Sequence, residues 1–349
     1  MSRTQDNRSL ARNAGPVTGP ARRWLPLDAA SVRLLAITAV LFLLMSVLNP
    51  GRFLTWRNLT SMGFQFPELG LFALAVALSL ITGGIDLSVI SIGNLTAILA
   101  ASILTAATGG GASSAWPAAG LVAAFAAALL ASALCGWING LLISRLHITP
   151  ILATLGTMQL YMGICLVITR GHAIAGFPAP VQFLGNGAVA GVPLPLLIFA
   201  ALTGATHLLL SRTRLGVSLC LLGTNPTAAR YSGLDVPRLL RRTYVITALL
   251  SGVAGLVILS RTNSAKADYG SSYLLQAVLV AILGGVNPRG GFGSAWGILL
   301  AVLSLQFLSS GLNMLQLNDF VGPYINNFTK EFTWGALLLI VMVANARRP

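Results

Sequence analysis

The sequence predicts an all-α protein that crosses a membrane about ten times. Hydrophobic residues make up 55% of the 349 positions and charged residues only 9%. The mean hydropathy is +0.81. A soluble domain of this length would need more polar surface, so the composition indicates a polytopic membrane protein. The net charge of +14 does not indicate nucleic-acid binding, because the basic residues lie in tails and loops between apolar runs.

The apolar residues fall into ten runs along the chain. Several runs are shorter than the ~20 residues that a straight membrane span needs. We expect flanking residues to extend some of them and others to be broken helices that their neighbours bury. The runs are roughly Leu34–Leu48, Phe64–Thr82, Leu87–Ala107, Ala118–Ile143, Ile148–Thr169, Val192–Leu210, Thr243–Leu259, Tyr273–Val286, Gly293–Ser310 and Phe332–Ala344.

The chain begins with a polar segment. Residues 1–31 are rich in arginine, with Gly and Pro, and no apolar stretch follows the start closely enough for an ordinary signal peptide. We expect a disordered cytoplasmic tail at 1–31 and a transmembrane domain at 32–346.

Lysine and arginine predict the orientation. With the N-terminus inside and ten spans, 16 of the 22 Lys and Arg residues fall in inside segments. Because cytoplasmic loops carry the excess of basic residues, both chain ends are predicted to be cytoplasmic.

Two glycine pairs interrupt apolar runs. Ile81-Thr-Gly-Gly-Ile-Asp86 is echoed by Ile282-Leu-Gly-Gly-Val-Asn287, which places one pair, Gly83 and Gly84, in the first half and the other, Gly284 and Gly285, in the second. Adjacent glycines allow a helix to bend or break. One such segment in each half indicates a central transport site. The alternative is that the glycines are helix-packing notches.

Asp86 follows the first glycine pair, at the end of an apolar run. A carboxylate beside membrane-spanning sequence usually marks a pathway or a partner. Three interpretations are open. Asp86 is a solvated loop residue, or it caps the next helix by accepting hydrogen bonds from N–H groups at Ser88 or Val89, or it pairs with an arginine across a gate.

The long loop predicted inside, 211–242, contains signals for a short helix. Asn225 is a good N-cap, Pro226 suits the first helical position, and Gly233 is a good C-cap, so the helix should run from Pro226 to Ser232. Ala228 and Ala229 would make it thin enough to enter a cleft, with Arg230 and Tyr231 gripping the walls. The alternative is an interfacial helix that contacts lipid.

Five motifs, in this order, resemble the inner-membrane permease subunit of ribose/arabinose/xylose-type ABC importers, over roughly residues 50–345. They are Phe53-Leu-Thr-Trp-Arg-Asn58; Ile81-Thr-Gly-Gly-Ile-Asp-Leu-Ser88; Asn139-Gly-Leu-Leu-Ile-Ser144 with Thr149-Pro-Ile-Leu-Ala-Thr-Leu-Gly-Thr157; the loop Gly223–Asp235; and Gly284-Gly-Val-Asn-Pro-Arg-Gly-Gly-Phe-Gly293 with Gly297.

The resemblance implies an all-helical permease like that of the vitamin B12 importer. It also implies that the loop Gly223–Asp235 holds a coupling helix that docks on an ATPase. The ATPase-coupling residues would be Gly223, Asn225, Pro226, Ala228, Ala229, Arg230, Tyr231 and Gly233.

Two departures from the family pattern leave the solute open. Ile90 stands where the family usually has Gly after Asp-Leu-Ser-Val, and Tyr273-Leu-Leu-Gln-Ala277 lacks an acidic residue that the family often carries.

The partners implied are a separate ATPase, a periplasmic sugar-binding protein, a second permease copy or a related permease, and the lipid bilayer of the bacterial inner membrane, with no nucleic acid. The chain has no Gly-x-x-x-x-Gly-Lys-Ser/Thr motif, so ATP hydrolysis should occur on another chain. We therefore expect that this chain is not itself an enzyme and binds no cofactor, ATP and Mg being used by the ATPase. Cys135, Cys165 and Cys220, and the three histidines, have no metal-type spacing.

Polar residues within the spans are candidates for a gate or solute path. Uncharged hydrogen-bonding groups suit a hydroxyl-rich solute such as a monosaccharide. Each could equally bond a neighbouring helix. The gate and translocation candidates are Gly83, Gly84, Asp86, Asn94, Thr154, Gln159, Gln276, Gly284 and Gly285, with Thr96 and Thr157 as further polar residues in the spans.

Two other functions compete with an ATP-driven importer. A secondary transporter or channel would work without an ATPase and would not need a capped docking helix. A membrane-embedded enzyme would need a nucleophile or paired-carboxylate motif, and none is present.

Overall fold

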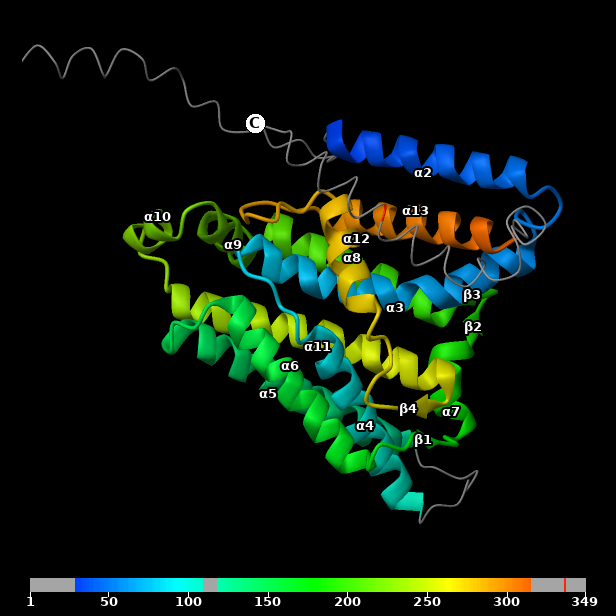
Figure 1. Ribbon diagram of the computed structural model, residues 1–349, viewed down its shortest axis with the longest axis horizontal. Coiled ribbons are helices and arrows are strands. Elements are labelled where there is room, and N and C mark those ends of the chain that lie inside the picture. The colour runs from blue at the N-terminus through cyan, green and yellow to red at the C-terminus, as the bar shows by residue number, and fades with distance from the viewer. Residues whose placement is uncertain (1–28, 109–117, 315–335, 337–349) are drawn as a thin grey trace, which may run out of the picture.

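The computed structural model describes residues 29–108, 118–314 and 336, and it confirms the all-α class there (Figure 1). The strands are short pairs, β1 with β4 and β2 with β3, both antiparallel. The elements in chain order are α2 Ala29–Leu48, α3 Trp56–Ile81, α4 Val89–Thr108, α5 Ala118–Arg145, α6 Pro150–Thr169, β1 Ile174–Ala175, α7 Ala179–Asn186, β2 Ala188–Val189, β3 Val192–Pro193, α8 Leu194–Arg212, α9 Arg214–Thr224, α10 Pro226–Tyr231, α11 Val236–Thr262, β4 Ser264–Ala265, α12 Tyr273–Leu283 and α13 Ala295–Met314.

Helices α3 and α11 form the centre of the molecule. Every residue of α3 from Gly70 to Ile81 is buried. Helix α11 packs along α3, α4 and α5. Lipid can cover an apolar helix, so apolar character alone does not enclose these two; small residues allow the close packing, as where the backbone of Gly255 in α11 meets that of Gly93 in α4.

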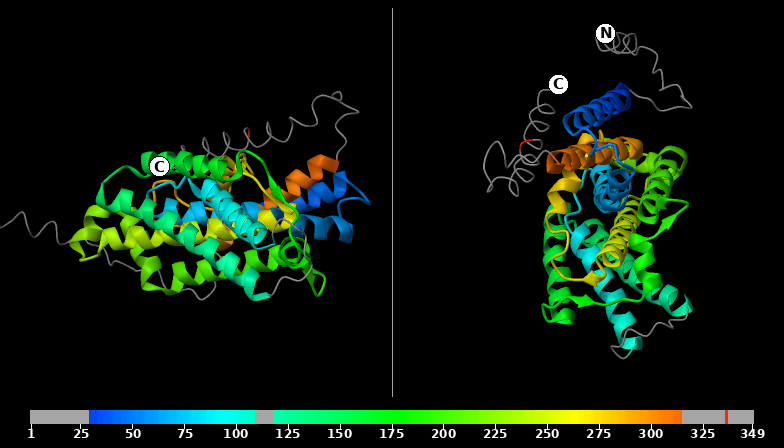
Figure 2. Two further views of the ribbon diagram at one scale, coloured as in Figure 1. Left: turned by 90° about the horizontal axis from the view of Figure 1, so that it is seen from below. Right: turned by 90° about the vertical axis from the view of Figure 1, so that its right-hand side faces the viewer.

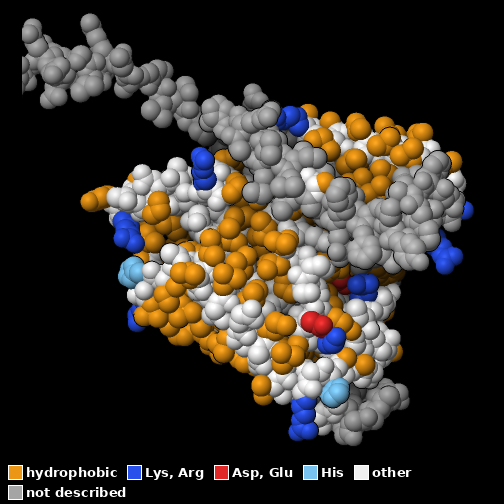
Figure 3. Space-filling view, in the orientation of Figure 1, with side chains coloured by type: hydrophobic (Ala, Val, Ile, Leu, Met, Phe, Trp, Pro, Cys, Tyr) orange, Lys and Arg blue, Asp and Glu red, His pale blue; other side chains and the backbone are white. Residues whose placement is uncertain are grey.

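The outer helices present apolar side chains outward. Leu43 and Val47 of α2, Leu130 of α5 and Val167 of α6 are all more than half exposed. Figure 3 shows a broad apolar surface on one face of the molecule, with most Lys and Arg side chains near its margins. In a chain of this composition, lipid is the natural neighbour of such a surface.

Among the described residues, eight helices are long and apolar enough to cross a membrane. The first nine of the ten predicted runs each coincide with a helix. The eighth run forms α12, which has only 11 residues. At 1.5 Å per residue, α12 is about 16 Å long, roughly half of the hydrocarbon thickness, so it is one of the short helices expected. The tenth run, Phe332–Ala344, lies outside the described residues except for position 336, and the count of ten stays a prediction. Of the tail predicted at 1–31, residues 1–28 also lie outside them, and residues 29–31 are helical because α2 begins at Ala29.

The loops separate into two ends of the helix bundle. At one end lie the connections 82–88, 146–149 and 284–294 together with α9 and α10; at the other, β1 pairs with β4 and α7 packs on the end of α11 (Figures 1 and 2). The backbone N–H of Phe177 also donates to Asn263 Oδ1 at 2.9 Å at this second end. We call them the α10 end and the α7 end. The α10 end holds the segments predicted to be cytoplasmic.

Cysteine labelling tests this orientation. In a background without the three native cysteines, Asn225→Cys should be shielded from an impermeant thiol reagent added to intact cells, and Lys266→Cys should react. Permeabilising the cells should expose Asn225→Cys. Labelling of position 225 from outside intact cells would overturn the orientation.

Candidate functional site

Both glycine pairs end a helix, as predicted. Gly83 has φ +82° and Gly285 has φ +86°, a left-handed conformation that glycine adopts without steric cost. After each positive-φ glycine, the next N–H donates to the carbonyl five residues back: Gly84 to Ser79 at 3.3 Å and Val286 to Ala281 at 3.1 Å. This is the Schellman arrangement, which satisfies carbonyls at a helix C-terminus.

The two glycine turns align differently in the structure and in the sequence. The echo aligns Gly83 with Gly284, whereas the structure gives Gly83 and Gly285 the same conformation. Asp86 Oδ1 accepts from the N–H of Ser88 at 3.0 Å, and Asn287 Oδ1 accepts from the N–H of Arg289 at 3.1 Å, so these two side chains do correspond. The second turn is therefore one residue shorter than the first.

Asp86 is completely buried, so the interpretation as a solvated loop residue is wrong. Its carboxylate accepts from the N–H and the hydroxyl of Ser88, at 3.0 and 2.6 Å, and from the hydroxyl of Thr247 at 3.3 Å. The hydrogen bond from Ser88 just before α4 is the one expected of a cap. Among the described residues, Asp86 forms no ion pair with an arginine.

Burial raises the pKa of the Asp86 carboxyl, and the hydrogen bonds from Ser88 and Thr247 oppose that rise.

The Asp86 network joins the 82–88 connection to three helices. Asn139 of α5 donates to the Ser88 hydroxyl at 2.7 Å, and Tyr161 of α6 donates to the carbonyl of Cys135 at 3.0 Å. Thr154 of α6 donates to the carbonyl of Ile85 at 3.1 Å. Together with Thr247 of α11, these side chains fix the 82–88 connection against α5, α6 and α11. Such a network is stable in a buried place only when its polar groups find partners.

Thr247 and Tyr161 carried no signal in the sequence, because a lone hydroxyl in an apolar run is common. Asn139 was marked only as part of a family motif. Their role in the network depends on helix packing between distant parts of the chain.

The other pathway candidates do not gather around Asp86. Asn94 is buried and its amide donates to the carbonyls of Ala267 and Tyr269, at 2.8 and 2.9 Å, so it holds the connection that follows β4. Gln276 is half-buried on α12, and Gln159 lies exposed on α6. Of the candidates, the structure brings together Gly83, Gly84, Asp86 and Thr154.

The short helix α10 forms as predicted, within one residue at its C-terminus. Asn225 Oδ1 accepts from the N–H groups of Thr227 and Ala228, each at 3.0 Å, and Gly233 has φ +78°. The preceding segment, Arg214–Thr224, was expected to be loop and is the helix α9. It forms because Leu219 and Leu222 recur on one side and are buried.

The two alanines of α10 do not both face outward. Ala229 is buried in the core of this chain and therefore anchors α10 rather than entering a partner's cleft. Arg230 is exposed, and Tyr231 is 89% exposed. The projecting side of α10 thus carries Arg230 and Tyr231.

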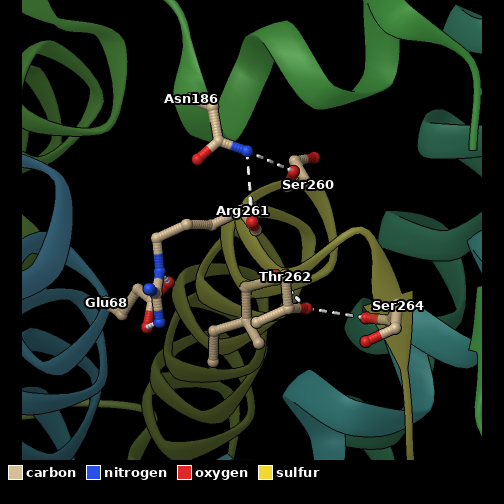
Figure 4. A network of polar contacts seen from close by, with 7 residues as sticks. Glu68, Asn186, Ser260, Arg261, Thr262 and Ser264 are labelled. Carbon is tan, nitrogen blue, oxygen red and sulfur yellow. Dashed lines mark hydrogen bonds and ion pairs between the residues drawn. The ribbon is translucent and has the colours of Figure 1, made fainter.

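A buried ion pair at the α7 end was not predicted from the sequence. Glu68 of α3 is 1% exposed and accepts two hydrogen bonds from Arg261 of α11: one from Nε and one from an Nη at 3.1 Å (Figure 4). Asn186 of α7 donates to the carbonyls of Ser260 and Arg261. A carboxylate inside the run Phe64–Thr82 was the available signal, because such groups are rare in spans and usually paired. Nowhere in the described ranges do three His, Cys, Asp or Glu side chains gather to hold a metal ion.

The contacts of Asp86 predict a graded stability series. Asp86→Asn keeps a cap acceptor and should cost about 1 kcal/mol, whereas Asp86→Leu leaves the N–H and the hydroxyl of Ser88 without an acceptor at about 1–3 kcal/mol each. The Thr247 hydroxyl keeps the carbonyl of Tyr244 at 2.9 Å. Thermal unfolding of the purified protein in detergent measures the difference. The exposed Asp268→Leu should have little effect. Equal melting temperatures for Asp86→Leu and Asp86→Asn would contradict the cap.

Comparison with known proteins gives the family. A model described as branched-chain amino acid transport system / permease component matches residues 58–344. Curated relatives named autoinducer 2 import system permease protein LsrD are 37% identical over 319 residues in Klebsiella pneumoniae subsp. pneumoniae, with 90% of each chain covered, and 33% identical over 320 residues in Yersinia enterocolitica, with 89% of this chain and 91% of the relative covered. No solved structure matches, and the likeness to the vitamin B12 importer stays a prediction. The chain belongs to this permease family and is a multi-pass membrane subunit of a bacterial ABC importer.

Proposed function

We propose that this chain moves a sugar or sugar-like solute across the inner membrane, with a separate ATPase docked on α10 and a periplasmic solute-binding protein at the α7 end. The observation that carries the proposal is the geometry of α10. Its caps at Asn225 and Gly233 fix its ends, Ala229 fastens it to the core, and Arg230 and Tyr231 project from it. A secondary transporter or channel has no need of such a helix.

The solute class is supported by the relatives and by the polar residues. The relatives are named as autoinducer 2 importers. Gln159 and Gln276 are uncharged, as suits a neutral solute rich in hydroxyl groups.

A second permease, either another copy or a related chain, would cover the outer side of α6. Gly156, Gln159 and Gly163 lie on one side of this helix at helical spacing, and added Cβ atoms at the two glycines would meet nothing within 4 Å. Lipid cannot satisfy the exposed amide of Gln159, whereas a facing helix or a polar path can. The proposed solute path therefore runs between the two permeases, along this side of α6.

Substitution of Tyr231 tests the docking face. Tyr231→Ala should abolish co-purification with the ATPase while the membrane level of the permease is unchanged, because exposed aromatic anchors carry much of the energy of interfaces. Trp56→Ala is the matched control: it removes an aromatic that is 70% exposed at the opposite end. Equal ATPase recovery with Tyr231→Ala and with wild type would refute docking through this side chain.

The cap at Gly233 gives a separate test. Gly233→Val places a β-branched residue at φ +78°, at a cost of roughly 1 kcal/mol or more, although no atom would obstruct the new Cβ. ATP-dependent uptake should fail while the protein still inserts. Gly51→Val imposes the same strain at φ +75°, also in open space, between α2 and α3, and should leave uptake intact. Normal uptake with Gly233→Val would show that the shape of α10 is unimportant.

A further inference from the structure

Three segments that are far apart in the sequence meet through their backbones at the α10 end. They are the C-terminus of α3, the last turn of α9, and the loop 284–294 between α12 and α13. We call the contact among Ile81, Gly83, Gly223, Gly290 and Gly291 the glycine junction.

A hydrogen bond lies at the centre of the glycine junction. The N–H of Gly291 donates to the carbonyl of Ile81 at 3.0 Å. Ile81 is the last residue of α3, and its carbonyl has no partner within the helix. The loop after α12 thus caps α3 across more than two hundred residues of sequence.

Gly223 of α9 lies directly against this hydrogen bond. A Cβ at Gly223 would stand 1.9 Å from the Ile81 oxygen and 2.4 Å from the Gly291 nitrogen, between acceptor and donor. A Cβ at Gly290 would stand 2.8 Å from the Gly83 nitrogen and 2.9 Å from the Gly223 oxygen. Because all of these neighbours are backbone atoms, no rotamer change could relieve the overlap.

The glycine junction is connected directly to α10. Asn225, which caps α10, follows Gly223 by two residues, and its own N–H donates to the carbonyl of Leu221 at 3.1 Å. On the other side, the turn at Gly83 leads into Asp86, whose carboxylate is bonded to Ser88 and Thr247. The loop 284–294 begins with the turn at Gly285, directly after the end of α12.

We propose that Gly223 is a positioning residue, and that the glycine junction passes a displacement of α10 to both glycine turns as one rigid unit. The inference rests on the proposed function, since α10 must receive the ATPase. It explains why Gly290 and Gly291 follow the second glycine pair: the loop 284–294 presents bare backbone to the turn at Gly83 and to α9. The same residues then link ATP hydrolysis to the Asp86 network and to α12.

The first experiment compares Gly223→Ala with Gly204→Ala in the full importer reconstituted in liposomes. Both glycines are helical with ordinary φ, and a Cβ at Gly204 of α8 would meet nothing within 4 Å. Gly223→Ala should keep its membrane level and its bound ATPase, while solute uptake per ATP hydrolysed falls about tenfold. Gly204→Ala should match wild type. Wild-type uptake per ATP with Gly223→Ala would overturn the proposal.

If Gly223→Ala does not assemble, a second experiment tests whether the glycine junction moves as one rigid unit. A Cβ at Gly291 would lie 3.4 Å from the Thr224 Cα, so Thr224→Cys with Gly291→Cys, in a background with Cys220→Ala, brings the two sulfurs within reach of a disulfide. Gly291→Cys is strained at φ +98°, so the reduced double variant, which carries the same strain, is the reference for the oxidised one. A rigid unit predicts that uptake after oxidation stays within about twofold of uptake by the same protein after reduction. Loss of uptake on oxidation that reductant restores would mean that the segments separate during transport, and would overturn the proposal.

Recovery of the ATPase with the wild-type protein separates the proposed function from the proposal on the glycine junction. If wild type recovers no ATPase, the proposed function fails and the glycine junction inference fails with it. If wild type recovers the ATPase and takes up solute, but Gly223→Ala is fully coupled, only the glycine junction inference fails.

Discussion

Backbone polar groups at packed helix ends must find partners within the protein, and this constraint explains most of the α10 end. Helices α3 and α12 both end among packed neighbours rather than in water. Their last carbonyls are satisfied by the turns at Gly83 and Gly285, and that of Ile81 by Gly291. The Asp86 carboxylate serves the opposite need, because it accepts from the N–H of Ser88 where α4 begins. Glycine and aspartate at these places satisfy the backbone groups of helix ends that pack against neighbouring segments.

The two central helices are held together by polar contacts at two separate places. Glu68 of α3 pairs with Arg261 of α11 at the α7 end, and Asp86, just after α3, accepts from Thr247 of α11 near the α10 end. A buried carboxylate without its partner costs several kcal/mol, so these contacts specify how α3 and α11 align even where they add little net stability. The apolar surfaces between them pack closely but are less selective about register.

Local chemistry explains which features were predictable. The caps of α10, Asn225 and Gly233, act within a few residues of themselves, and the apolar runs needed only composition. The register of the second glycine turn, the pairing of Glu68 with Arg261 and the inward position of Ala229 depend on contacts between distant helices, and no single stretch of sequence encodes them. The helix α9 was predictable in principle from its apolar spacing, but its position in a basic segment between two spans suggested a loop.

Helix α2 has a different relation to the rest of the chain. Among the described elements, it packs mainly on α13, with the Thr38 and Ser304 hydroxyls 2.7 Å apart across 266 residues. At translation rates of about 5–20 residues per second, on the order of tens of seconds separate the synthesis of the two helices. During that interval α2 lies in lipid with few contacts beyond the edge-to-face pair of Phe42 and Phe53, as the two-stage view of membrane protein folding allows. The helix made first among those described is therefore one of the last to be docked, and the membrane itself has to hold it in place until α13 arrives.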